Sequence, residues 1–125
     1  SLAASMPRRV TAFPARAEAA AAQIQAQTEA LRAQLADLES RIRFDVTMRQ
    51  LELESARAGK AVTRRGIEAA KDAVRIARDR YEEGVLSSSE LLDAETRRLR
   101  AELDATQADA QIQIALAHLN RALGR

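Results

Sequence analysis

The 125-residue chain has no cysteine and no tryptophan, and it has only one tyrosine and two phenylalanines. Without cysteine, disulfides and thiolate metal sites are excluded. Aromatic residues make up 2% of the chain, and most of its 46% hydrophobic fraction is alanine, so little material is available for a thick globular core. No apolar run approaches the roughly twenty residues that a membrane-spanning helix needs. We therefore expect neither a disulfide-stabilised domain nor a transmembrane helix.

The chain also lacks any block of one charge. Twenty basic and eighteen acidic residues are interleaved along it, and the formal net charge is +2. Nucleic-acid binding would need clustered lysine and arginine, so we expect no nucleic-acid partner. There is no glycine-rich phosphate loop, and Ser87–Ser89 have no histidine base nearby in the sequence. The single histidine, His118, is expected on the surface. These observations predict no enzyme activity, no metal site and no cofactor.

Proline is scarce too, because both prolines fall within the first fourteen residues. The remaining sequence has the composition of long helices and coiled coils. It predicts a loosely ordered lead-in over 1–13, a long helix over 14–83 with Pro14 in its first turn, a tip turn over 84–87 and a shorter return helix over 88–123. Gly84 is suited to ending the first helix, Ser87 and Glu90 form a capping-box pattern, and Gly124 is suited to ending the second.

Small residues recur every seven positions on both sides of this turn. If the chain folds back at Val85 and Leu86, Ala77 meets Ala94 and Ala56 meets Ala115, and small residues on both partners allow two helices to approach closely. The predicted fold is therefore all-α, a long antiparallel coiled-coil helical hairpin with unequal arms, forming one domain. Its expected seam consists of Ala56, Thr63, Ala70, Ala77, Ala94, Ala101, Ala108 and Ala115.

Two further features of the long helix concern packing. Gly59 and Gly66 lie inside it, and we interpret them as positions of close helix packing because glycine otherwise weakens a helix. The earlier part carries a separate apolar row that the shorter return helix cannot reach. This row predicts a partner outside the hairpin, such as another copy of the chain, and it consists of Ile24, Leu31, Leu35, Leu38, Ile42 and Val46.

The segment 80–94 carries an ordered motif. It contains Arg80, Tyr81, Gly84, the turn Val85-Leu86-Ser87, then Glu90, Leu91-Leu92 and Asp93-Ala94. This motif resembles the tip of the TolC-like outer-membrane efflux proteins, and the resemblance extends over about residues 20–124. It implies the helical hairpin of the second repeat, which is a fragment of a periplasmic α-barrel, in a trimeric channel of the Gram-negative envelope. The barrel strands and the first repeat of that family are not in this sequence, so contact with the membrane would come only through other parts of a parent protein.

The resemblance also implies roles for individual residues. A tip formed by Tyr81, Gly84, Val85, Leu86 and Ser87 would contact a periplasmic adaptor protein, which links the channel to an inner-membrane pump. Glu90 and Asp93 would match the carboxylates that surround the tunnel entrance. From the residues alone, both could equally stabilise the start of the return helix. Arg78 and Arg80 could form ion pairs with Glu90 or Asp93, although exposed pairs contribute little.

Two other functions fit the same pattern. The chain could be the coiled-coil hairpin of a periplasmic adaptor, or membrane-fusion, protein. It could also be a structural coiled-coil scaffold with no transport role. Tyr81, the Leu91-Leu92 pair and the Ala-Leu-Gly sequence near the end favour the channel over the adaptor. The exported substrate stays open, because tunnel-wall helices do not select cargo closely.

Overall fold

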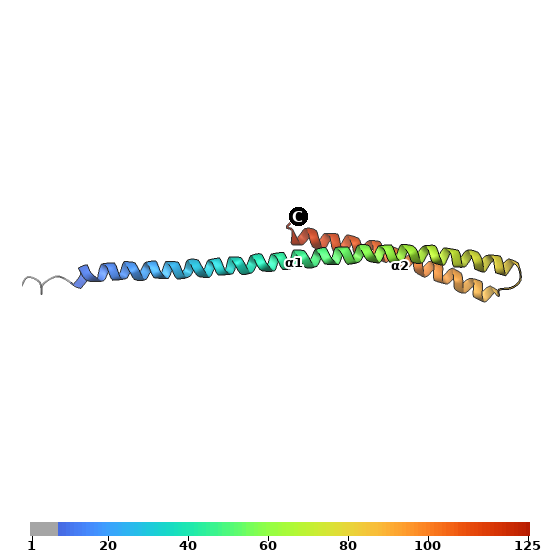
Figure 1. The fold of residues 1–125 in the computed structure, drawn as a ribbon, viewed down its shortest axis with the longest axis horizontal. Coiled ribbons are helices and arrows are strands. Elements are labelled where there is room, and N and C mark those ends of the chain that lie inside the picture. The colour runs from blue at the N-terminus through green and yellow to red at the C-terminus, as the bar shows by residue number, and fades with distance from the viewer. Residues whose placement is uncertain (1–7) are drawn as a thin grey trace, which may run out of the picture. The chain divides into compact units, whose positions relative to one another are not determined.

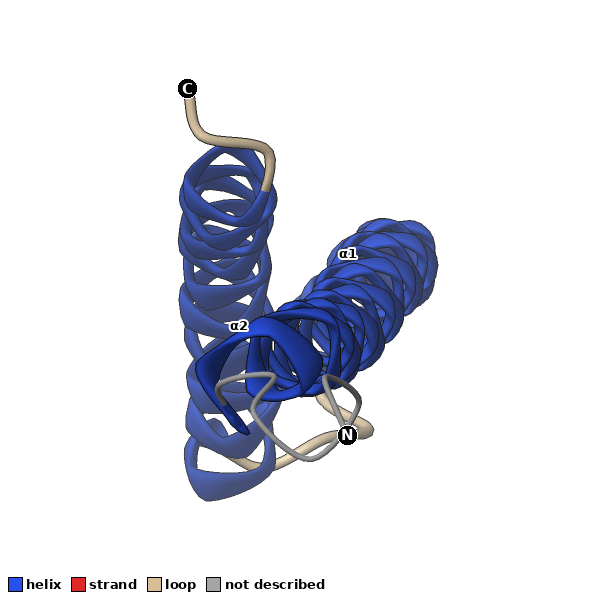
Figure 2. Cartoon of the chain, turned by 90° about the vertical axis from the view of Figure 1, so that its left-hand side faces the viewer, coloured by secondary structure: helices blue, strands red, loops and turns tan. Residues whose placement is uncertain are grey.

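The structure, a computed structural model, describes residues 8–125, and the surroundings of side chains from residue 13 onward. Helix α1 spans Arg8–Glu82, with 75 residues, and helix α2 spans Ser88–Ala122, with 35 residues. Only helices and turns occur in this part of the chain (Figure 2). The predicted all-α helical hairpin is therefore confirmed.

Helix α1 begins earlier than the sequence suggested. Residues 8–13, which we expected in a loosely ordered lead-in, are helical, and Pro14 lies inside the helix and not in its first turn. The segment before Pro14 contains no glycine or proline from residue 8 onward, and a proline near a helix start removes only one backbone donor. The rest of the expected lead-in, residues 1–7, lies outside the described residues.

Helix α1 continues without a break through Gly59 and Gly66. A Cβ atom built on either glycine would meet no other atom within 4 Å. Our interpretation of these glycines as close-packing positions is therefore wrong for this hairpin. Gly59 lines an open groove between α1 and α2, and the turns on either side of each glycine maintain the helix.

The chain divides into two units, with the boundary between Arg43 and Phe44. In the second unit, α2 runs back beside the C-terminal part of α1 (Figure 1). The buried hydrophobic residues of this hairpin form a thin core, as expected where alanine supplies most of the contact surface. They are Leu53, Val74, Ala77, Ala94 and Ala115.

In the first unit, the residues up to Arg43 contribute a single helical segment of α1. Its larger apolar side chains are exposed, with exposed fractions of 62% for Ile24, 60% for Leu31 and Leu35, 53% for Leu38 and 50% for Ile42. One ion pair in this unit joins neighbouring turns of α1, between Arg41 and Asp37 at 2.8 Å. Neither α1 nor α2, within residues 8–125, has both the length and the apolar character needed to cross a membrane.

Candidate functional site

The hairpin tip, which we define as residues 81–87, is built by a glycine-terminated helix end. Gly84 has a φ of 76°, a left-handed conformation that glycine adopts without strain. The Val85 amide donates to the Arg80 carbonyl at 2.9 Å, and the Gly84 amide donates to the Tyr81 carbonyl at 3.0 Å. These two bonds form a Schellman motif, which satisfies the last carbonyls of α1 and turns the chain sharply. Gly84 therefore has a structural role at the tip.

Helix α2 starts with the capping box that the sequence predicted. The Glu90 amide donates to the Ser87 hydroxyl at 3.2 Å, and the Ser87 amide donates to the Glu90 carboxylate at 2.9 Å. The backbone bond from Ser87, followed by the bond from its hydroxyl, lowers the pKa of Glu90 below its usual value. Ser87 and Glu90 are therefore engaged in holding the turn, whatever else they contact.

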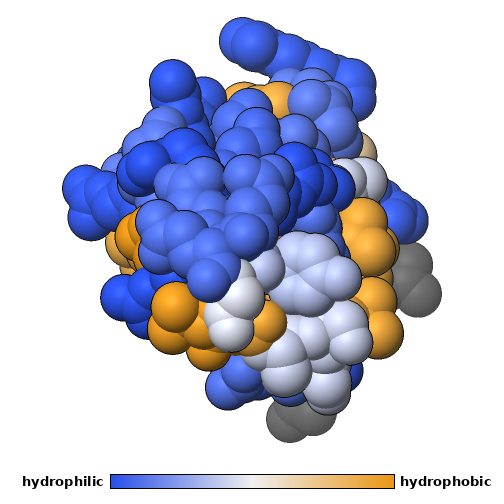
Figure 3. All heavy atoms as spheres, turned by 90° about the vertical axis from the view of Figure 1, so that its right-hand side faces the viewer, coloured by the Kyte–Doolittle hydropathy of each residue, from blue (hydrophilic) through white to orange (hydrophobic). Residues whose placement is uncertain are grey.

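The tip presents two of its larger side chains to solvent. Val85 is 72% exposed and Tyr81 is 46% exposed. Leu86 behaves differently, because it is half-buried and packs against the cluster of Val74, Ala77 and Ala94. Of the residues expected to contact an adaptor, Leu86 thus folds inward and covers the end of the seam, while Val85 stays exposed. Figure 3 looks onto this end of the hairpin and shows hydrophobic atoms in separate patches among hydrophilic ones.

A groove of about 400 Å³ lies beside the tip, between α1 and α2. Its apolar part is formed by Ala73, Ile76, Ala77, Leu86 and Ala94. Glu90 and Asp93 line it from α2, together with the cations Arg80 and Arg97. The structure thus brings both predicted entrance carboxylates to one groove, where two guanidinium groups balance their charge.

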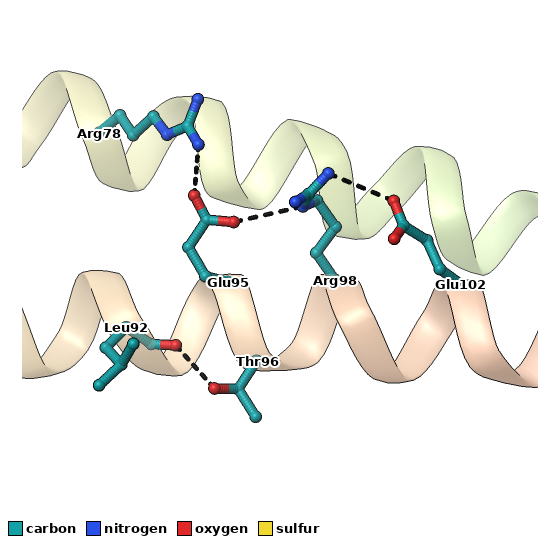
Figure 4. A network of polar contacts seen from close by, with 6 residues as sticks. All are labelled: Arg78, Leu92, Glu95, Thr96, Arg98 and Glu102. Atoms are coloured by element: carbon teal, nitrogen blue, oxygen red, sulfur yellow. Dashed lines mark hydrogen bonds and ion pairs between the residues drawn. The ribbon is translucent and has the colours of Figure 1, made fainter.

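Farther from the tip, an ion-pair network crosses the hairpin. Arg78 on α1 reaches across to Glu95 on α2, and Glu95 also accepts from Arg98 at 3.2 Å (Figure 4). Arg98 continues the network to Glu102 at 3.2 Å. The bond from Arg78 is the main cause that lowers the pKa of Glu95 below its usual value, and Arg98 adds to it. The expected partner of Arg78 was Glu90 or Asp93. That prediction is wrong, because Glu90 is held by its cap and Arg78 reaches Glu95, which lies farther along α2.

The small residues of the expected seam lie between the two helices and are buried to different extents. Ala77, Ala94 and Ala115 are buried, with Ala115 only 1% exposed. The others are half-buried: Ala56, Thr63, Ala70, Ala101 and Ala108. The Thr63 hydroxyl donates to the Lys60 carbonyl at 2.9 Å, so its polar atom is satisfied within α1. A Lys60–Asp109 ion pair at 2.9 Å also joins the two helices at this level.

A polar cluster near the C-terminal end of α2 was missed from the sequence. His118 Nδ1 lies 2.9 Å from Glu52 Oε1 and 3.4 Å from Arg49 Nη1, while Arg49 also contacts the other Glu52 oxygen at 2.9 Å. A protonated Nδ1 donates to Glu52, and an unprotonated one accepts from Arg49. The bond from Arg49, followed by that from His118, lowers the pKa of Glu52. The signal was available, because the pairing of Ala56 with Ala115 also places His118 beside Glu52.

Among the described residues, no group of three or more His, Cys, Asp or Glu side chains could hold a metal ion. No family model, no curated protein and no solved structure matches the chain.

Proposed function

We propose that this chain is a tunnel-wall hairpin of a TolC-like outer-membrane efflux or secretion channel, acting in the periplasm of a Gram-negative cell. The single observation that carries the proposal is the tip: a sharply capped turn that exposes Val85, within the ordered motif of residues 80–94. A turn that only connected two helices would not need an exposed valine at its apex. Tyr81 of the same tip is 46% exposed, so the tip offers two side chains with exposed apolar surface to another protein.

In this proposal the hairpin conducts passively. The helices form part of a conduit wall, and the tip docks a periplasmic adaptor protein through Val85 and Tyr81. Asp93 contributes a carboxylate near the tunnel entrance, where a repeated acidic group favours cations. An inner-membrane pump supplies the energy. The wall requires several copies of the hairpin, as in a trimer, and the exposed apolar residues of α1 would be covered in the assembled channel.

The test uses the parent gene in a cell that lacks its own channel of this class. Val85→Asp is the sharpest variant, because Val85 is exposed and its replacement leaves the buried contacts of the hairpin intact. Gly84 and Leu86 are poorer targets, since changes there also disturb the turn or the core. Gln111→Asp adds the same charge at an exposed position of α2 away from the tip and serves as the control.

We expect Val85→Asp to abolish drug tolerance or secretion while the channel stays at normal abundance in the outer membrane. Gln111→Asp should behave like the unchanged protein. Full activity of Val85→Asp would contradict docking at the tip. A parent gene whose flanking sequence encodes a lipoyl-like domain split around the hairpin would instead identify an adaptor protein and contradict the channel.

A further inference from the structure

We draw no further inference here: the strongest candidate, the exposed apolar face of α1 in the first unit formed by Ile24, Leu31, Leu35, Leu38 and Ile42, carries none, because nothing in the structure shows what covers it.

Discussion

Replacing Gly59 and Gly66 with alanine should stabilise the hairpin. Both glycines lie inside α1, and an added Cβ atom at either position meets nothing within 4 Å. Alanine is therefore accommodated without strain, and it reduces the conformational freedom of the unfolded chain. Each replacement should raise the free energy of unfolding by about 1 kcal/mol. The two sites are about 10 Å apart along the helix, so the double variant should gain about 2 kcal/mol.

The assay is urea unfolding followed by circular dichroism at 222 nm, with the slope of the transition compared between variants. Ala58→Gly is the matched control, because Ala58 is an exposed neighbour in the same helix and its change should lower the free energy of unfolding by about 1 kcal/mol. A loss of stability in the Gly59→Ala or Gly66→Ala variant would show that another helix approaches these positions closely, contrary to the open space around them.

Three further changes follow from the same contacts. Ala94→Leu should lower the free energy of unfolding by about 1–3 kcal/mol in urea titrations, because Ala94 is buried in the seam and a larger side chain overpacks it; unchanged stability would mean that the helices do not approach closely there. Ser87→Ala removes the hydroxyl that accepts from the Glu90 amide and should lower the free energy of unfolding by about 0.5–2 kcal/mol. No effect would argue against the capping box. The pKa values of Glu52, Glu90 and Glu95 are lowered in the folded chain, so their stabilisation is present above their usual pKa and is lost as pH falls through the folded values. Thermal unfolding followed from about pH 6 to about pH 3 should show a falling midpoint, and a midpoint that stays constant or rises would contradict the ion-pair assignments.

Much of this hairpin could be predicted from the sequence, because its strongest signals are local or periodic. Gly84 and the Ser87–Glu90 pair identify the turn by backbone chemistry alone. The seven-residue spacing of alanine, with Ala77 and Ala94 at its ends, follows from the geometry of packed helices.

The details that failed depend on the path of the chain in space. Leu86 turns inward because the seam ends beneath it, and no sequence period applies inside a turn. Arg78 selects Glu95 by reach across the helix pair. The open surroundings of Gly59 could not be predicted, because glycine is compatible both with a close contact and with none.

The most direct test of the fold-back is a distance measured across the hairpin. The chain has no cysteine, so a variant with Lys60→Cys and Asp109→Cys can carry two nitroxide labels at the positions of the 2.9 Å ion pair between α1 and α2. Double electron–electron resonance is recorded with excess unlabelled chain, so that only distances within one molecule contribute. Adjoining helices predict a separation under about 25 Å, whereas one continuous helix through these 49 residues would place the labels about 70 Å apart. A distance distribution centred near the larger value would contradict the hairpin and every proposal built on it.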